Sequence, residues 1–259
     1  MARKHAPLGQ HFLTAKGTVL RLVEALTAPP HMPIIEIGPG TGVVTRELLS
    51  RFDRVVAIEK DVELAAALSH TFAAEIASGQ LRIIVGDALD FDPRAYGITE
   101  AYAVVGNIPY YITGALFRLV LTHDDQPTEI AFLIQREVAE RIVERDGKRS
   151  ILSLSVAAYG TPKIISHVKP GAFNPPPAVD SSILYVGDIS RTTFTDNTIS
   201  ETTFFTLVKT GFAHKRKKLQ NNIDVSADVL ESVGIDPDAR AEDVPLTCWI
   251  ALTRALYRT

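Results

Sequence analysis

Residues 33–49 read PIIEIGPGTGVVTRELL and decide the fold class. The stretch joins a short apolar run, Pro33–Ile37, to a helical pattern that begins at Gly42 and ends at Leu49. An apolar run of this length that ends in glycine predicts a buried strand. Closely spaced glycines let the chain turn tightly and let a ligand approach the backbone. The stretch therefore predicts a strand, a ligand-binding loop and a helix in succession.

The same alternation of strand and helix continues along the chain. Helical patterns at Val62–Phe72 and Arg136–Glu144 separate short apolar runs bounded by turn residues. Strands that alternate with helices indicate a Rossmann-like α/β fold with a doubly wound, mostly parallel sheet. The further strands are predicted at Arg54–Ile58, Leu81–Val85, Ala101–Val105, Ile130–Ile134, Lys163–Val168 and Ser182–Val186.

The pattern changes after Gly187. Ser190–Ser200 is polar and rich in threonine, which is typical of a linker. We therefore expect an α/β domain over residues 1–189 and a small helical domain over residues 190–259. The helical patterns in the second region are Phe204–Phe212, Leu219–Ile223, Ala227–Val233 and Thr247–Leu256.

Composition excludes several classes of protein. The 259 residues are 46% hydrophobic and 22% charged, which is typical of a globular chain. No apolar stretch approaches the roughly 18 residues of a membrane span, and the N-terminus lacks the apolar core of a signal peptide. Cys248 is the only cysteine, so a disulfide within the chain is impossible and a cysteine-based metal site is not expected. We expect a cytoplasmic, monomeric protein without a metal.

The glycine loop indicates which cofactor is bound. A dinucleotide site would need G-x-G-x-x-G, but Val43 stands at the position of its third glycine. The form E-x-G-x-G-x-G resembles motif I of methyltransferases that use S-adenosylmethionine (SAM). We therefore expect Gly38 and Gly40 to contact SAM, and the spacing disfavours a dinucleotide oxidoreductase.

Two acidic residues end or follow the next two predicted strands. Glu59 ends the run RVVAIE, 21 positions after Gly38, and Asp87 follows LRIIVG. A carboxylate at the first position can accept hydrogen bonds from both hydroxyls of a ribose. Asp87 is placed to accept one from an adenine amine. Open α/β sheets bind ligands at the carboxyl ends of their strands, so these residues are expected to share one site with Gly38.

Residues 106–113, GNIPYYIT, predict the chemistry. The tetrapeptide from Asn107 to Tyr110 resembles motif IV of amino-methyltransferases. An adenine amine is a poor nucleophile, and the Asn107 oxygen with the carbonyl of Ile108 or Pro109 can accept its two hydrogens. The nitrogen lone pair can then point at a sulfonium methyl. Pro109 stiffens the loop, and Tyr110 offers a flat face on which the base can stack.

With these motifs the chain resembles one family, the KsgA/Dim-type rRNA adenine dimethyltransferases, to which the Erm-type enzymes are related. The resemblance covers about residues 7–223. It implies N6-dimethylation of adjacent adenines in a hairpin loop of small-subunit (16S) rRNA, and a role in ribosome biogenesis. It rests on LGQHFL (8–13), EIGPGTG (36–42), GDA (86–88), GNIPYYIT (106–113), QREVAER (135–141) and FNPPPAVDS (173–181).

The resemblance also implies the roles of individual residues. Phe173 would face the target base opposite Tyr110, and would complete a catalytic set with Asn107 and Pro109. The family often has Asn where this chain has His11, so a backbone contact is expected there. The implied SAM contacts are His11, Leu13, Gly38, Glu59, Asp87 and Asn107.

A basic run lies after the cofactor motifs. Residues 209–218, KTGFAHKRKK, carry five Lys or Arg and no acid in a chain of net charge −3. Such a patch can hold phosphates, and the alternative is a solvated helix face. In the family a stretch like this faces RNA, so the resemblance favours RNA contacts, with Arg3 and Lys4 adding to them. The expected RNA-binding residues are Lys215, Arg216, Lys217 and Lys218.

Two other functions stay open. An Erm-type enzyme would modify an adenine of large-subunit (23S) rRNA and confer antibiotic resistance, although FNPPPAVDS and the glycine before NIPY resemble the small-subunit branch more closely. A catalytically silent, RNA-binding assembly factor would share the fold. The intact Asn107, Pro109 and Tyr110 argue against it.

Overall fold

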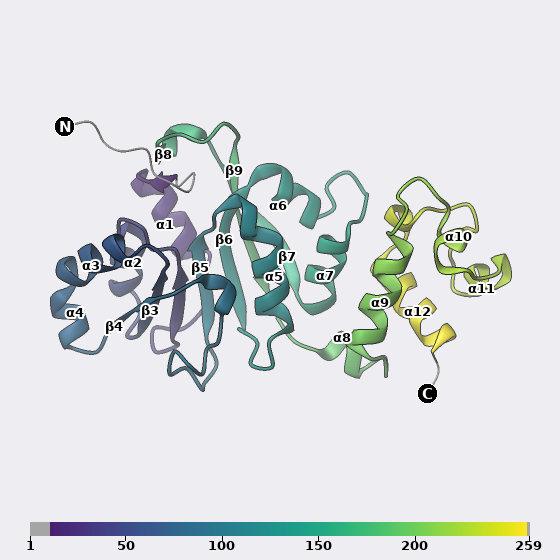
Figure 1. Cartoon of the computed structure of the whole chain (residues 1–259), viewed down its shortest axis with the longest axis horizontal. Coiled ribbons are helices and arrows are strands. Elements are labelled where there is room, and N and C mark those ends of the chain that lie inside the picture. Colours follow the sequence, from purple (N-terminus) through teal and green to yellow (C-terminus); the bar gives the residue numbers. More distant parts are fainter. Residues whose placement is uncertain (1–10, 258–259) are drawn as a thin grey trace. The chain divides into compact units, whose positions relative to one another are not determined.

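The computed structural model describes residues 11–257 (Figure 1). Leu8–Gln10 of the N-terminal motif, and Arg3 and Lys4, lie outside this range. By their contacts the residues form two compact units. One contains the chain up to Ala139 together with Lys163–Ile189, and the other contains Glu140–Pro162 together with the chain from Ser190 onward.

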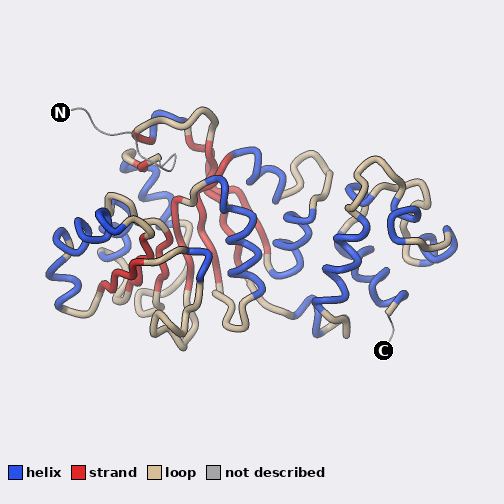
Figure 2. Tube along the Cα trace, viewed as in Figure 1, coloured by secondary structure: helices blue, strands red, loops and turns tan. Residues whose placement is uncertain are grey.

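The first unit is built on a seven-stranded sheet of order β4-β3-β2-β5-β6-β9-β7 (Figure 2). The neighbours from β4 to β6 pair in parallel, while β9 runs antiparallel to β6. The predicted α/β sheet is therefore confirmed. The strands are β2 (Ile34–Ile37), β3 (Val55–Glu59), β4 (Leu81–Val85), β5 (Ala103–Asn107), β6 (Glu129–Gln135), β7 (Thr161–Val168) and β9 (Ser181–Gly187).

Helices cover both faces of this sheet, so the strands are apolar on both sides, as parallel strands usually are. On one face α1, α2 and α3 bury residues such as Leu22 and Leu48 against Ile34 and Ala103. On the other face Phe117 of α5 meets Phe132 of β6 at 5.1 Å between ring centroids. The helices are α1 (Lys16–Glu24), α2 (Val43–Leu49), α3 (Val62–Thr71), α4 (Ala73–Ala77), α5 (Thr113–Thr122) and α6 (Arg136–Ile142).

The order of the strands places a switch point between β2 and β5. From β2 the chain proceeds through β3 to β4 on one side, and then returns to β5 and β6 on the other side. Ile34 pairs with Val55 in one direction and with Ala103 in the other. The loops after the two strands leave the sheet at the same edge. This divergence opens a crevice at their carboxyl ends, the usual ligand site of such sheets.

A two-stranded ribbon, absent from the sequence-based expectation, fastens the start of the described chain. Strand β1 (Phe12–Leu13) pairs antiparallel with β8 (Phe173–Asn174), although about 160 residues separate them. The amide of Thr14 also donates to the carbonyl of Ala172 at 2.8 Å. This pairing holds the FL of the N-terminal motif against the FNPPP segment.

The second unit is helical, and its core is formed around Trp249. The ring stacks on Phe212 at 6.0 Å, and Phe204 and Leu230 are buried with it. A Cβ on Gly211 would lie 2.4 Å from the Trp249 ring, so the close packing requires glycine there. Its helices are α7 (Ile151–Tyr159), α8 (Thr192–Thr195), α9 (Glu201–Gly211), α10 (Leu219–Ile223), α11 (Ala227–Ser232) and α12 (Leu246–Leu256).

The second unit differs in two ways from the sequence-based expectation of a linker at Ser190–Ser200 and a boundary between residues 189 and 190. The polar stretch Ser190–Ser200 contains α8, because Phe194 is buried against Tyr159 at 5.2 Å between ring centroids. Residues 140–162 cluster with the C-terminal helices rather than with the sheet. The functional division into 1–189 and 190–259 stays a prediction. In the described range no helix is long and apolar enough to span a membrane.

Candidate active site

A pocket of about 320 Å³ lies at the carboxyl ends of strands β2 to β5. It gathers residues that sequence motifs had predicted separately. They come from the glycine loop after β2, from the ends of β3 and β4, and from the loop after β5. The central ones are Gly38, Gly40, Glu59, Asp87, Asn107 and Tyr110.

The glycine loop adopts a conformation that other residues rarely take. Gly38 and Gly40 have φ angles of 66° and 56°, and a Cβ on Gly40 would lie 3.0 Å from the Phe12 ring. Gly106, the glycine before NIPY, also allows a close approach, because a Cβ there would lie 2.4 Å from the Ile37 carbonyl oxygen. Small residues are therefore required on both strands that flank the crevice.

Glu59 holds this loop in place. Its carboxylate is 4% exposed; Oε2 accepts from the Gly40 amide at 3.0 Å and Oε1 from the Asp61 amide at 2.9 Å. Each oxygen can accept a further hydrogen bond, since a carboxylate offers about four lone-pair sites. Glu59 can thus accept from two ribose hydroxyls while it anchors the loop.

Asp87 has a partner that the motifs did not predict. Oδ2 accepts from Nζ of Lys60 at 2.6 Å, and Oδ1 accepts from the Leu89 amide at 3.0 Å. The hydrogen bond from Lys60, followed by that from Leu89, lowers the pKa of the Asp87 carboxyl, so it is ionised at neutral pH. Lys60 directly follows Glu59 in the sequence, but nothing in the pattern EKD tells which acid it pairs with. Asp87 remains able to accept from an adenine amine.

Asn107 is oriented by the backbone of His11. Its Nδ2 donates to the His11 carbonyl at 2.8 Å. Because a carbonyl can only accept, the side-chain NH₂ must face His11, and Oδ1 is left as an acceptor for another group. The carbonyl of Pro109 accepts from the Ile112 amide at 3.1 Å. Among the described backbone groups the Ile108 carbonyl has no such donor, which favours it as the second acceptor for an amine.

Tyr110 is held by a residue of the last predicted motif. Its hydroxyl lies 2.8 Å from Oγ of Ser181, which is fully buried at the start of β9. The His11 ring lies on another side, with centroids 6.2 Å apart, and its Nδ1 donates to the Pro175 carbonyl at 2.8 Å. Burial raises the pKa of the Tyr110 phenol above its usual value, so the ring is uncharged at neutral pH. Ser181 is a residue of the site that sequence reasoning did not assign.

Two predicted site residues lie elsewhere. Leu13 and Phe173 are 2% and 5% exposed, pair across β1 and β8, and belong to the core of the first unit instead of the pocket lining. The short ribbon turns both side chains inward. The contact of Phe173 with the target base and that of Leu13 with SAM stay predictions.

Glu36, the first residue of motif I, is buried beneath the pocket. It is 1% exposed, and Oε2 has no hydrogen-bond partner among the described residues. Burial, with a smaller contribution from the Glu59 carboxylate, raises the pKa of Glu36 from 4.5 to about 8. Glu36 is therefore largely protonated at neutral pH.

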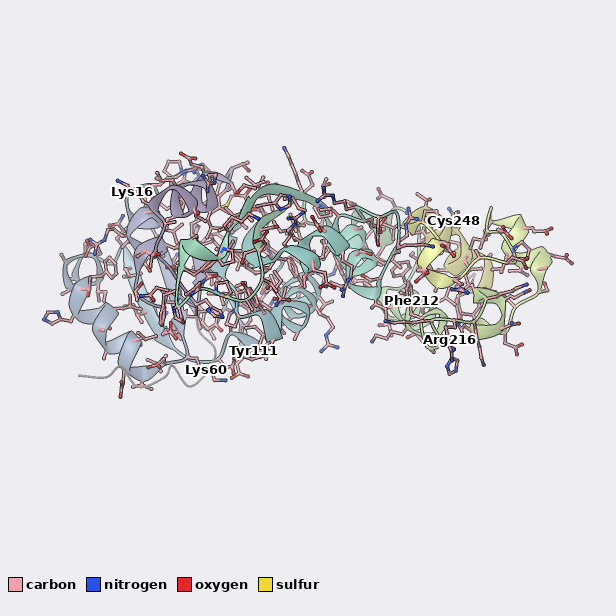
Figure 3. The ribbon with its side chains drawn as sticks, turned by 90° about the horizontal axis from the view of Figure 1, so that it is seen from above. Lys16, Lys60, Tyr111, Phe212, Arg216 and Cys248 are labelled. Atoms are coloured by element: carbon pink, nitrogen blue, oxygen red, sulfur yellow. The ribbon has the colours of Figure 1, made fainter. Side chains whose placement is uncertain are left out.

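The basic run begins with Lys209 in the last turn of α9 and ends at Lys218, just before α10, in the second unit. Lys215 to Lys218 are exposed and lie between the two helices, and their contact with RNA stays a prediction. Lys218 forms an ion pair with Asp238. For Lys215, Arg216 and Lys217 the described part of the chain contains no ion-pair partner (Figure 3 labels Arg216).

No group of His, Cys, Asp and Glu within residues 11–257 could hold a metal ion. The fold and the pocket instead define a class of protein: an α/β methyltransferase with a motif I glycine loop, an acidic strand end and an N-I-P-Y loop. The sequence profile described as "Ribosomal RNA adenine dimethylase" matches residues 1–256, and the chain belongs to this family. The family predicted from the motifs is thus confirmed, and with it an enzyme that uses S-adenosyl-L-methionine.

Similar proteins carry a consistent description. The chain is 38% identical to "Ribosomal RNA small subunit methyltransferase A" of Dehalococcoides mccartyi over 93% of this chain and 84% of the relative. It is 39% identical to the protein of the same description from Deinococcus radiodurans, over 96% of this chain and 84% of the relative.

Two solved structures share the fold. A dimethyladenosine transferase from Plasmodium falciparum has a TM-score of 0.80 at 22% identity, over 93% of this chain and 96% of that one. The 23S rRNA methyltransferase ErmE has a TM-score of 0.76 at 24% identity, over 95% and 99%. At these identities the likeness supports the fold alone, so the ErmE match does not favour the large-subunit alternative.

Proposed function

We propose that this protein transfers methyl groups from S-adenosyl-L-methionine to N6 of adenines in small-subunit rRNA, forming dimethyladenosine. The observation that carries the proposal is the orientation of Asn107. Its NH₂ is engaged by the His11 carbonyl, so Oδ1 is left as an acceptor, and Asn107 and Ile108 both line the pocket. The relatives described as small-subunit methyltransferases support the choice of rRNA.

The pocket fits the cofactor by its shape and its acceptors. The left-handed glycines bring the loop backbone next to the crevice, Glu59 offers acceptors for the ribose hydroxyls, and ionised Asp87 offers one for the adenine amine. The bound cofactor supplies an electrophilic sulfonium methyl. The residues that we propose hold it are His11, Leu13, Gly38, Gly40, Glu59, Asp87 and Asn107.

The catalytic residues act on the amine rather than on the methyl group. Asn107 Oδ1 and the Ile108 carbonyl each accept one amine hydrogen, which directs the nitrogen lone pair at the incoming methyl. Bound SAM would supply the methyl group to this nitrogen, and the amine would then release one proton to solvent. Because the amine becomes acidic only as it attacks, no strong base is needed. Tyr110, fixed by Ser181, stacks on the adenine, which is worth roughly 1–3 kcal/mol.

RNA contacts outside the pocket are assigned to the basic loop. Lys215, Arg216 and Lys217 have free ammonium or guanidinium groups for phosphates, while Lys218 would have to leave Asp238. We infer that residues 1–189 serve catalysis and residues 190–259 serve RNA contacts. We also infer that the protein acts as a monomer in the cytoplasm.

The experiment is methylation of purified small and large ribosomal subunits that lack these modifications, followed by mass spectrometry of the nucleosides. We expect dimethyladenosine in the small-subunit rRNA, formed roughly 30- to 1,000-fold more slowly with Asn107→Ala. Methylation confined to the large subunit would instead indicate an Erm-type enzyme. Binding of the small subunit without any methyl transfer would indicate an assembly factor.

A further inference from the structure

Two adjacent tyrosines at the pocket have opposite surroundings. Tyr110 is partly buried and its hydroxyl is held by Ser181. The side chain of Tyr111 is 66% exposed, and within residues 11–257 no hydrogen bond or ring contact engages it. Of the aromatic residues described, only Tyr111 and Tyr257 are exposed, and only Tyr111 lines the pocket. The ring of Tyr111 therefore contributes little to the core and faces outward at the mouth.

The charges beside Tyr111 restrict what can bind there. Lys60 lies next to it (Figure 3), but its ammonium is engaged by Asp87 at 2.6 Å. That hydrogen bond is the largest cause of the raised pKa of Lys60, to which Tyr111 and Asp90 also contribute. The Lys60 ammonium is thus already paired with the Asp87 carboxylate, which does not favour a phosphate. An uncharged flat group fits the exposed ring better.

We propose that Tyr111 is a stacking subsite for the base of the nucleotide that flanks the target adenine. This inference rests on the proposed function, because the target base must enter the pocket next to Tyr110. Tyr110 and Tyr111 are adjacent in the sequence and both line the pocket, so the nucleotide next to the target adenine passes close to Tyr111.

The subsite has a defined task. A target base turned out of its stack loses contact with its neighbour, at a cost of a few kcal/mol. Tyr111 stacks on the neighbouring base in place of the target base, while Tyr110 stacks on the target base itself. Stacking accepts every base because each has a flat π face, so Tyr111 supports binding without reading the sequence.

The test combines enzyme variants with altered RNA. Small ribosomal subunits are reconstituted with rRNA that is abasic at the 5′ or the 3′ neighbour of a target adenine, and methylation is measured at that adenine alone, because the implied target adenines are adjacent. We expect Tyr111→Ala to lower kcat/KM on unaltered subunits by roughly 5- to 150-fold, mainly through KM for the subunit, with SAM affinity unchanged. Tyr111→Phe should keep the wild-type value. Val62→Ala removes a side chain that is equally exposed, at 66%, but outside the pocket, and it should have no effect.

The decisive readout is the coupling between protein and RNA. An abasic neighbour on one side should lower the wild-type rate as much as Tyr111→Ala does, and the two changes together should cost no more than either alone. Additive losses with both RNAs, or a fall in SAM affinity for Tyr111→Ala, would overturn the subsite. Absence of dimethyladenosine with wild-type enzyme and unaltered subunits would overturn the proposed function and the subsite with it.

Discussion

The pocket of the first unit and the basic loop of the second unit hold their functional side chains in different ways. In the pocket Glu59, Asp87, Asn107 and Tyr110 each have a hydrogen-bond partner within the protein. In the loop at 215–218, only Lys218 has an ion-pair partner among the described residues. A small cofactor and one base need acceptors at defined positions, whereas phosphates along an RNA need charge that can adapt.

Changes in the pocket should therefore alter SAM binding or methyl transfer, whereas changes in the loop should alter the electrostatic attraction between the protein and RNA. Removing a buried hydrogen-bond acceptor should produce a large effect that is confined to stability, SAM binding or turnover. Replacing exposed cations should weaken RNA binding a little for each residue, by an amount that depends on the salt concentration.

The largest effect is expected from Glu36 as the pH changes. Below the pKa of 4.5 that Glu36 has in the unfolded chain, its carboxyl is protonated in both the folded and the unfolded state. Between pH 4.5 and the folded pKa of about 8, the carboxyl ionises only in the unfolded chain. Stability should therefore fall between these values, by up to about 5 kcal/mol, and level off above them. Urea unfolding of wild type and Glu36→Gln across this range should show a steeper loss for the wild type. Parallel curves would mean that burial does not hold the proton on Glu36.

Asn107→Ala should lower turnover strongly and leave SAM affinity within a few-fold. The variant removes an acceptor that acts mainly in the transition state, so the loss should be about 2–4 kcal/mol, or roughly 30- to 1,000-fold in kcat. Single-turnover methylation of small subunits measures the rate, and calorimetry with SAM serves as the control. Turnover close to wild type would remove Asn107 from the catalytic set.

Glu59→Ala should weaken SAM binding by about 1–3 kcal/mol, without changing which adenine is methylated. The variant loses the proposed acceptor for the ribose and also the anchor of the Gly40 amide. Glu63→Ala is the matched control, because Glu63 is exposed on the following helix and lies outside the pocket. Equal SAM affinity for the two variants, measured by calorimetry, would contradict the role of Glu59.

The smallest effects per residue are expected in the basic loop. Replacing Lys215, Arg216, Lys217 and Lys218 with Gln should flatten the salt dependence of subunit binding by roughly 1–3 units of log–log slope and spare SAM binding. Lys218→Gln alone should change it least, because Lys218 is already paired with Asp238. Binding measured across a salt series decides the matter. An unchanged slope in the fourfold variant would mean that the loop does not contact phosphates.

The largest part of the fold could be predicted because it follows from local patterns. Short apolar runs ending in Gly, Glu or Asn became β2, β3 and β5, and the helical spacing at 62–72 became α3. The ribbon of β1 and β8 could not be predicted, since each strand has only two residues and its pairing is entirely long-range. Helix α8 could not be predicted, because its one buried side chain, that of Phe194, lies within a stretch that is otherwise polar.

The sequence by itself determined the motifs, the order of strands and helices, and the family. The glycines, Glu59, Asp87 and Asn107 could be identified because each chemical role permits few residue types, and parallel strands bring their carboxyl ends to one edge. Tertiary structure alone decided the partners. His11 and Asn107 meet 96 positions apart, Tyr110 and Ser181 meet 71 apart, and Leu13 pairs with Phe173 across β1 and β8. These contacts depend on how the ends of the sheet and the ribbon pack in three dimensions, which no local pattern of residues records.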